Sequence, residues 1–338
     1  MKNEQNKPMT IKDIAAEAGV SICTVSRVLN KSDLVGKKTK KKVERVIEEN
    51  GYIPNEMARS LLRKKSRTIA LLIPDLSNPF YAELFFGIEE VMSSEGYYVY
   101  VCNTNYKMEN ERRYIKELIG RGIDGMIFMS LYYCGEDIFD FVRKNVSAVA
   151  VQTKVRDMDL IVTDVQETGA EAIRHLFELG HRKIGYICFD KKTNVERLHS
   201  YLISHKEAGV PVKDEYVIDG CTPDTLGYMA AKRLLSLPEP PTAIQAFNDY
   251  TALGVYQAVI EAGLNIPKDI SIVSYDDIKI AGLLNPPLTT VNQPIQEMGR
   301  TAGDLLLKNI SRGAEHLPKE IHLPSKFVIR SSTAPPAR

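Results

Sequence analysis

Residues 10–30 carry apolar positions at the spacing of two short amphipathic helices. The first series has the i, i+3, i+4, i+7 spacing that places side chains on one helix face: Ile11, Ile14, Ala15 and Ala18. The second series is Val25, Val28 and Leu29. Thr10 and Ser21 can cap these helices, and Gly19 can take the left-handed conformation that ends the first. Two short helices joined by a glycine-containing turn are typical of a helix-turn-helix unit, although a plain helical hairpin has the same pattern.

Lysines gather at the start of a third predicted helix, Lys38–Asn50. They are Lys37, Lys38, Lys40, Lys41 and Lys42. Positive charge at a helix N-terminus opposes the helix dipole, and the phosphates of a nucleic acid would remove that conflict. Pro54 then breaks the chain, and Asn55–Leu62 is predicted to be one more short helix. Because about eight residues are too few to stay helical alone in water, we expect this helix to form only when another surface supports it.

From Thr68 onward, apolar runs typical of strands alternate with helical patterns. The predicted strands are Ile69–Pro74, Tyr97–Cys102, Gly125–Met129, Ala148–Val151, Leu160–Val162, Ile184–Cys188, Tyr216–Ile218, Ala243–Ala246, Ile270–Ser274 and Ile321–Val328. The predicted helices include Tyr81–Glu95, Glu109–Ile119, Glu167–Leu179 and Asp249–Ala262. Near-continuous apolar strands separated by helices indicate parallel sheets that are covered on both faces. Ten strands are many for one open sheet, so we expect two lobes, with crossings near Leu160–Asp164 and Thr289–Pro294.

The charge of the chain is unevenly distributed. The net charge is only +1 over 338 residues, but residues 1–67 hold 16 Lys and Arg against 8 Asp and Glu. The rest of the chain holds 28 basic against 35 acidic residues. A basic segment on an acidic body indicates a polyanionic partner for that segment alone. Together with the helix-turn-helix pattern, this distribution favours nucleic acid.

Other signals disfavour export and membrane association. The five cysteines are an odd number with no CxxC pair, which is typical of reduced thiols, so we expect a cytoplasmic protein. Met1–Thr10 has no apolar core of the kind that a signal peptide needs. No apolar run reaches the roughly 18 residues that span a bilayer. A solute-binding protein for transport would carry an export signal in place of the basic segment, and it is therefore disfavoured.

No motif in the sequence supports catalysis or metal binding. The GxGxxG sequence at Gly120–Gly125 follows a predicted helix and precedes a strand, the reverse of the dinucleotide-binding context. The six histidines form no HExxH or i, i+4 pair, so no metal site is expected. There is also no GxSxG, P-loop or paired-carboxylate motif. We therefore expect neither an enzyme nor a bound cofactor.

Seven segments, in order and spacing, resemble the LacI/GalR family of bacterial transcriptional regulators. They are VSICTVSRVLN, GYIPNEMARSLL, TIALLIPDLSNPFYAEL, GHRKIGYI, NDYTALG, ISIVSYDD and PPLTTVNQP, within Met9–Pro335. The resemblance implies an N-terminal all-α helix-turn-helix domain at 9–54, a hinge helix and linker at 55–67, and an α/β two-lobed effector domain of the periplasmic-binding-protein type at 68–338. The expected lobes are about 68–162 with 292–320 and about 163–291 with 321–333. The resemblance also implies a homodimeric repressor of a carbohydrate uptake or catabolism operon, bound to a pseudo-palindromic operator in double-stranded DNA.

By this resemblance, Ile22, Cys23 and Arg27 contact base edges in the major groove, and Thr24 and Ser26 lie near phosphates. An arginine can bond guanine in a bidentate manner, and an isoleucine can pack on a thymine methyl group. Cys23 fits equally well as a small buried hydrophobe. The other DNA-binding residues that the resemblance implies are Thr10, Ser21, Asn30, Tyr52, Asn55, Ala58, Arg59 and Leu61.

Leu61 resembles the leucine that enters the minor groove at the centre of an operator, where an apolar wedge unstacks a base step and kinks the DNA. The alternative is that Leu61 packs on the body as an ordinary helix residue. Closure of the lobes on an effector would change the separation of the two Asn55–Leu62 segments in a dimer. Their helices would then form or melt, which would couple the effector site to the operator.

Ligands of doubly wound sheets meet residues just beyond the carboxyl ends of the strands. Strand ends and the resemblance together give the expected effector-binding residues Phe80, Tyr81, Asp164, Arg197, Asn248 and Asp276. The aromatic rings would cover the apolar face of a sugar or base, and the polar groups would bond hydroxyls. Gln152 stands where many family members have Asp, so we expect a smaller or unconventional pocket. A sugar, a sugar phosphate, a nucleoside, or a protein corepressor in place of a small ligand are all compatible with these residues.

Overall fold

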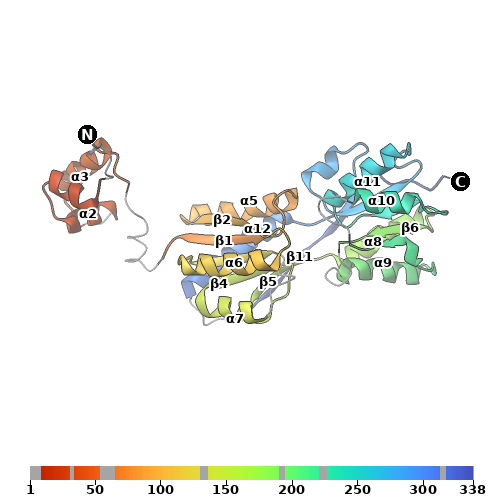
Figure 1. Cartoon of the computed structure of the whole chain (residues 1–338), viewed down its shortest axis with the longest axis horizontal. Coiled ribbons are helices and arrows are strands. Elements are labelled where there is room, and N and C mark those ends of the chain that lie inside the picture. Colours follow the sequence, from red (N-terminus) through yellow and green to blue (C-terminus); the bar gives the residue numbers. More distant parts are fainter. Residues whose placement is uncertain are drawn as a thin grey trace. The chain divides into compact units, whose positions relative to one another are not determined.

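The computed structural model describes residues 9–30, 34–53, 65–129, 136–189, 195–220, 227–312 and 317–337. Contacts within the chain divide it into two compact units, Met1–Ser66 and Arg67–Arg338, both drawn in Figure 1. The predicted hinge helix, with the expected DNA-binding residues Asn55, Ala58, Arg59 and Leu61, lies outside the described residues.

The first unit holds the helices α1 (Ile11–Glu17), α2 (Ile22–Leu29) and α3 (Lys37–Glu49). The predicted caps are confirmed: the Thr10 hydroxyl accepts from the backbone N–H of Asp13, and the Asp13 carboxylate accepts from that of Thr10 at 2.8 Å. The Ser21 hydroxyl accepts from the N–H of Thr24 at 3.1 Å, and Gly19 has φ 60° in the intervening turn. The buried apolar residues of all three helices form one small core, which consists of Ile14, Ala15, Ala18, Val25, Val28, Val43 and Val46.

The described residues of the second unit form two sheets of six strands each, which confirms the two-lobed α/β prediction. The sheet of lobe 1 has the order β11 (Glu320–Pro324), β5 (Asp159–Asp164), β4 (Ser147–Val151), β3 (Gly125–Met129), β1 (Thr68–Ile73), β2 (Tyr98–Asn103). The sheet of lobe 2 has the order β12 (Lys326–Val328), β10 (Thr289–Asn292), β9 (Ser271–Asp276), β8 (Ala243–Gln245), β6 (Ile184–Ile187), β7 (Val217–Ile218). Every neighbouring pair is parallel except β10 and β12.

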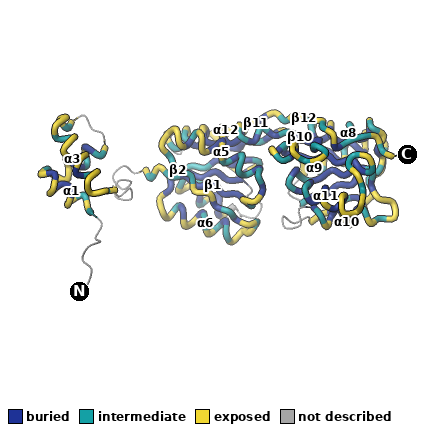
Figure 2. Tube along the Cα trace, turned by 90° about the horizontal axis from the view of Figure 1, so that it is seen from above, coloured by how far each residue is buried: buried dark blue, intermediate teal, exposed yellow. Residues whose placement is uncertain are grey.

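Helices cover both faces of each sheet (Figure 1). Those of lobe 1 are α5 (Pro79–Ser94), α6 (Met108–Gly120), α7 (Glu136–Asn145) and α12 (Ile295–Arg312). Those of lobe 2 are α8 (Gln166–Glu178), α9 (Val195–Glu207), α10 (Tyr228–Leu235) and α11 (Asp249–Glu261), with 3₁₀ turns at Asp214–Tyr216 and Lys279–Leu283. In β1, Leu71 faces the core under α5 and α12, whereas Leu72 faces the opposite core. This double burial explains the continuous apolar runs in the sequence, and Figure 2 shows it as dark strands inside exposed helices.

The C-terminal strands differ from the prediction. The run Ile321–Val328, expected as one strand of lobe 2, is two strands: β11 pairs with β5 in lobe 1, and β12 pairs with β10 in lobe 2. The chain crosses at Ser325, whose hydroxyl donates to the backbone carbonyl of Asp164 at another crossing. The segment Thr289–Asn292, expected only as a crossing, is itself a strand. Hydrophobic pattern gives the strands, but it does not tell which sheet an edge strand joins.

Glycines bring α5 and α12 into backbone contact. A Cβ atom added to Gly87 would lie 2.1 Å from the carbonyl oxygen of Gln296, and one added to Gly299 would lie 2.3 Å from that of Leu84. Real Cβ atoms do not approach backbone so closely, so only glycine fits at these two positions. This contact fixes α5 in lobe 1, and the first turn of α5 carries Phe80 and Tyr81.

We predict that Gly299→Ala lowers the free energy of unfolding by about 1–3 kcal/mol, because an extra methyl group in a close-packed contact forces the helices apart. Gly120→Ala is the matched control, since no atom lies within 4 Å of its added Cβ and its φ is not positive. That change should be neutral or slightly stabilising. Thermal unfolding of the full-length variants measures both, and equal midpoints would contradict the proposed contact.

Candidate functional site

The first turns of α2 present an exposed surface that combines apolar and charged side chains. Ile22 is 44% exposed, and Cys23 and Arg27 are exposed as well. Val25 and Val28, on the other face of the helix, are fully or almost fully buried in the core. The alternative that Cys23 is a buried hydrophobe is therefore wrong, since its thiol is exposed.

Thr10, Ser21, Asn30 and Tyr52, the other expected DNA-binding residues that lie outside α2 and are described, have structural partners. Thr10 and Ser21 cap helices, so their hydroxyls are already used within the protein. The Asn30 amide lies 3.5 Å from the hydroxyl of Ser26, and Tyr52 packs beside the small core. The structure thus brings Ile22, Cys23, Thr24, Ser26 and Arg27 onto one helix. Tyr52 comes from the segment after α3.

The N-terminus of α3 is electrostatically unfavourable on its own. Its cap residue is Gly36, which makes no side-chain hydrogen bond to the helix, and the first turn has no acidic residue. Lys37, Lys38, Lys41 and Lys42 are exposed there. Because the N-terminal end of a helix is positive, these cations lower the stability of the isolated helix.

A cavity of about 210 Å³ lies in the second unit at the carboxyl ends of the strands. Five of the six expected effector-binding residues line it: Phe80, Tyr81, Arg197, Asn248 and Asp276. The others that line it are Asn78, Met129, Gln152, Val165, Val195, Glu196, Phe247 and Gln293. The structure does not bring Asp164 to the cavity: it is exposed at the end of β5, and its neighbour Val165 lines the wall instead. Val165 lies beyond the end of β5 and is the cap residue of α8, so the strand-end rule selected the residue next to the one that lines the cavity.

Each described lining residue is placed by the end of a regular element. Asn78 caps α5 by accepting from the N–H of Phe80 at 3.0 Å, which orients the first turn of that helix. Asn248 caps α11 in the same manner, because its side-chain oxygen accepts from the N–H of Thr251 at 2.8 Å. Asp276 is the last residue of β9. The amide nitrogen of Asn248 makes no bond to the described residues, so it is free to donate to a ligand.

Arg197, near the start of α9, is held on several sides. Its Nη2 lies 3.2 Å from Oδ1 of Asp276, and its Nη1 donates to the backbone carbonyl of Phe247. The guanidinium carbon lies 4.6 Å from the centroid of the Phe247 ring and 4.7 Å from that of Tyr275. Contacts of this kind between a guanidinium and aromatic rings are attractive. These contacts orient the guanidinium at the wall of the cavity.

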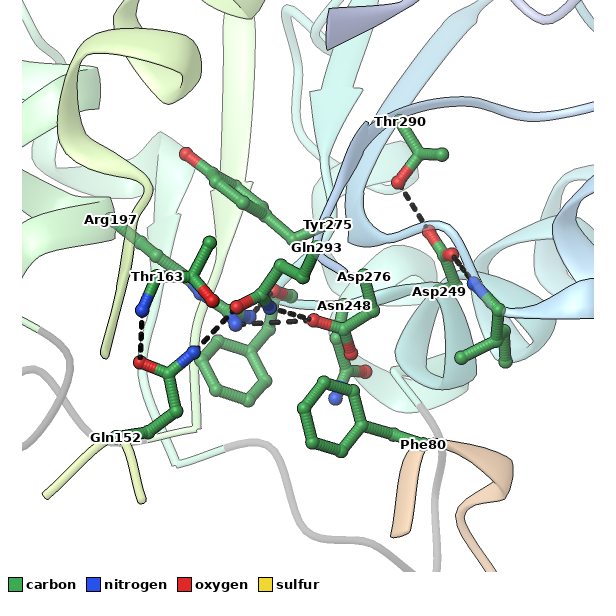
Figure 3. Close-up of polar contacts among 12 residues, drawn as sticks. Phe80, Gln152, Thr163, Arg197, Asn248, Asp249, Tyr275, Asp276, Thr290 and Gln293 are labelled. Atoms are coloured by element: carbon green, nitrogen blue, oxygen red, sulfur yellow. Dashed lines mark hydrogen bonds and ion pairs between the residues drawn. The ribbon is translucent and has the colours of Figure 1, made fainter. Parts of the chain in front are cut away.

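The side-chain amides of Gln293 and Gln152 connect the ion pair between Arg197 and Asp276 to lobe 1 (Figure 3). Gln293 donates from Nε2 to Oδ1 of Asp276 at 2.7 Å, and Gln152 donates from Nε2 to Oε1 of Gln293 at 2.6 Å. The backbone N–H of Thr163 donates to Oε1 of Gln152 at 3.3 Å. Gln293 was not among the expected site residues, because the segment before it, Thr289–Asn292, was expected as a crossing and not as a strand.

Burial raises the pKa of two carboxyl groups beside the cavity, those of Asp276 and Asp249. Loss of water raises the pKa of Asp276, and the charge of Arg197 and the hydrogen bond from Gln293 offset part of that rise. Asp249 is also buried, and burial together with the nearby Asp276 charge raises its pKa well above the ordinary value. Asp249 accepts from the Thr290 hydroxyl at 2.7 Å and from the N–H of Ile278 at 3.0 Å. Sequence reasoning noted Asp249 but assigned it no role.

The raised pKa of Asp249 predicts a pH-dependent contribution to stability. A carboxyl whose pKa is higher in the folded than in the unfolded chain stabilises the fold fully below its unfolded pKa, and that contribution is lost as the pH rises toward the folded value. Asp249→Asn removes the titration. The asparagine can still accept from Ile278 with its oxygen, while its amide donates to the Thr290 hydroxyl.

The thermal unfolding midpoint of the wild type minus that of Asp249→Asn should therefore decrease as the pH is raised from about 4 to about 8. Thermal unfolding across this range measures the difference. Asp304→Asn, at an exposed position on α12, is the control for the substitution of an aspartate by asparagine as such. A difference that rises with pH would show that the carboxylate is the favoured form of Asp249.

The described residues contain no group of three or more His, Cys, Asp or Glu that could hold a metal ion. Among those same residues, no helix combines the length and apolar character needed to cross a membrane. The GxGxxG sequence runs from the last residue of α6 to the first of β3, so it lacks the strand-to-helix context that dinucleotide binding requires.

Each of the two units resembles a known protein family. Residues 10–55 match the family described as bacterial regulatory proteins, lacI family, and residues 173–333 match the periplasmic binding protein-like domain. The HTH-type transcriptional regulator DegA of Bacillus subtilis (strain 168) is 37% identical over 96% of this chain and 98% of its own. A structure of the lac repressor dimer bound to operator and the anti-inducer ONPF is 28% identical, with a TM-score of 0.83 over 97% of this chain and 100% of that one. A LacI family regulator from Enterococcus faecium with bound ribose is 32% identical, with a TM-score of 0.71 over 79% of this chain and 99% of that one.

Proposed function

This chain belongs to the LacI family of bacterial transcription regulators, and we propose that it is a homodimeric repressor controlled by a small neutral polyhydroxy effector. The family consists of DNA-binding regulators and not of enzymes. The proposal goes further in three respects: the residues that bind the operator, the surface that joins two copies, and the chemical class of the effector.

The observation that carries operator binding is the exposed end of α2. Ile22, Cys23 and Arg27 are exposed on a helix whose Val25 and Val28 are buried, which is the arrangement that a recognition helix needs. The exposed lysines of α3 supply positive charge that phosphates would neutralise. We assign base contacts to Ile22, Cys23 and Arg27, and operator-centre contact to Leu61.

Arg27→Lys tests the base contact. The variant keeps the positive charge but loses the planar fork that bonds guanine at two points. We predict a loss of about 1–3 kcal/mol in binding to the preferred operator, with unchanged binding to unrelated duplexes and an unchanged salt slope. The operator is first selected from genomic DNA with the full-length chain, and affinities are then compared at one salt concentration.

The control for this experiment is Arg45→Lys. Arg45 is exposed on α3 and lies 3.6 Å from Glu49, so the same substitution there should not change operator affinity. Equal effects at Arg27 and Arg45 would remove Arg27 from the base contacts. A selection that enriches no preferred site would contradict the proposed operator binding itself.

The edge of lobe 1 supports a homodimer. Strand β2 ends the first sheet, and its Tyr98 and Tyr100 are 75% and 53% exposed. Phe86, on the neighbouring α5, is 55% exposed. An unpaired strand edge with large exposed apolar side chains is typical of an interface. The operator-bound lac repressor is a dimer, and we propose that a second copy of this chain covers the β2 edge.

The charges around the cavity favour a neutral effector. Arg197 already bonds Asp276 and the Phe247 carbonyl, and Glu196 adds a second carboxylate to the wall. A phosphate group would therefore meet more negative than positive charge among the described lining residues. Hydroxyl groups, in contrast, can donate to Asp276 and accept from Asn248, while the aromatic rings of α5 cover an apolar ring face. The ribose bound to the Enterococcus faecium regulator supports this class.

We predict that neutral pentoses or hexoses raise the unfolding midpoint of the full-length chain, because a ligand that binds only the folded state stabilises it. The panel contains ribose, glucose, ribose 5-phosphate, glucose 6-phosphate and adenosine, and calorimetry measures the affinity of any ligand that stabilises the protein. Asp276→Asn should abolish the stabilisation. Binding of the phosphates in preference to the parent sugars would contradict the proposed class, as would a protein corepressor acting with no small ligand.

A further inference from the structure

An aromatic contact joins the two lobes outside the effector cavity. Tyr106 belongs to the segment between β2 and α6 in lobe 1, and Phe189 follows β6 in lobe 2. Their ring centroids are 5.0 Å apart, with an interplanar angle of 33°. Neither residue lines the cavity.

The contact continues toward the effector-binding arginine. The centroid of Phe189 lies 6.4 Å from that of Phe247, and Phe247 lies under the guanidinium of Arg197. Three rings and the guanidinium therefore form a continuous series that begins in lobe 1 and ends in the cavity. Ring pairs at these distances are mutually attractive.

The segment that carries Tyr106 is anchored at both ends. The backbone N–H of Thr104 donates to the carbonyl of Ile73 at 2.8 Å, and that of Lys107 donates to the carbonyl of Thr104 at 3.1 Å. Between them, Asn105 and Tyr106 have φ values of 53° and 55°. A bulky residue in the left-handed region is unfavourable and persists where its surroundings hold it. The ring contact with Phe189 holds the Tyr106 side chain in place.

Other described contacts between the lobes are of two kinds: Ile278, which follows β9, is buried in the core of lobe 1, and two further contacts are polar. The Tyr250 hydroxyl donates to that of Ser77 at 3.2 Å, and the backbone N–H of Lys279 donates to the Glu83 carboxylate at 3.3 Å. These groups are exposed, so water can replace each of their bonds at little cost. Water cannot replace the contact between Tyr106 and Phe189 in the same way, because separation of the rings exposes apolar surface.

We propose that Tyr106 and Phe189 are positioning residues for the effector site, which close the lobes and press Phe247 against Arg197. Closure of the cleft and placement of the arginine are then one step. Tyr106 contributes to effector affinity without touching the effector. The inference about affinity rests on the proposed function, whereas the contact between the lobes does not.

The absence of tryptophan from the sequence permits a direct test. Phe189→Trp gives the full-length protein a single tryptophan in contact with Tyr106. Without any effector, acrylamide quenching and the emission maximum report how far that tryptophan is shielded. Addition of Tyr106→Leu, which keeps apolar bulk but removes the ring, should at least double the quenching constant and shift the emission to longer wavelength.

Two further variants separate positioning from general damage. Tyr106→Phe keeps the ring and should restore the shielding, and Lys107→Ala, at the exposed neighbouring residue, should leave it unchanged. Thermal midpoints verify that each variant is folded. Unchanged quenching in the folded Tyr106→Leu variant would overturn the contact between the lobes.

A second measurement tests the effect on the site. Ribose is titrated into the wild type, Tyr106→Leu and Tyr106→Phe, and we expect at least a tenfold loss of affinity in the leucine variant with recovery in the phenylalanine variant. Equal ribose affinities in all three would overturn the positioning role. Failure of ribose to bind the wild type would count against the proposed effector class, while the quenching result would still decide whether the rings hold the lobes together.

Discussion

The carboxylate of Asp276 is buried at the end of β9, and a buried charge is stable only when other groups replace its lost water. Arg197 and Gln293 both donate to the same oxygen, Oδ1. Gln293 in turn accepts from Gln152 of lobe 1. The need to satisfy one carboxylate therefore fixes the arginine and the segment where the chain returns to lobe 1. The second oxygen, Oδ2, makes no bond to the described residues and is available to a ligand.

The backbone around Asp276 is bent to expose this group to the cavity. Asp276 and Asp277 have φ values of 107° and 57°, a region that aspartate enters more readily than most side chains. Asp277 accepts from Arg330 at 2.6 Å and from Asn292 at 3.0 Å, so the second aspartate anchors the bend to β10 and to the segment after β12. Strain of this kind is found where the surrounding structure enforces it, most often at functional sites. Two adjacent carboxylates thus have different tasks: one faces the cavity, and the other holds the turn.

How much of this could be predicted depends on how far apart the partners are in sequence. The caps at Thr10 and Ser21 use groups three residues away, so a local pattern contains all the information. Asp276 and Asn248 were expected because strand ends converge in a parallel sheet and because the resemblance to the LacI/GalR family selects these two among the strand-end residues. The bond between Gln152 and Gln293 joins neutral amides 141 residues apart, and no local signal marks either as the partner of the other. The division of Ile321–Val328 between two sheets was missed for the same reason, because each half is defined by its neighbour.

Both candidate sites lie next to charged side chains whose positions are unfavourable for the stability of the fold. Lysines crowd the positive end of α3, and Asp249 keeps a carboxyl group where burial and a second carboxyl oppose its charge. Neither choice favours the isolated fold, since a neutral residue at either position would avoid the penalty. Conflicts between local preference and global structure are expected where a sequence also serves a function. The lysines lie in the unit that carries α2, and Asp249 lies beside Asp276 at the cavity. The positions that cost the protein stability are therefore next to the surfaces that we assign to the operator and the effector.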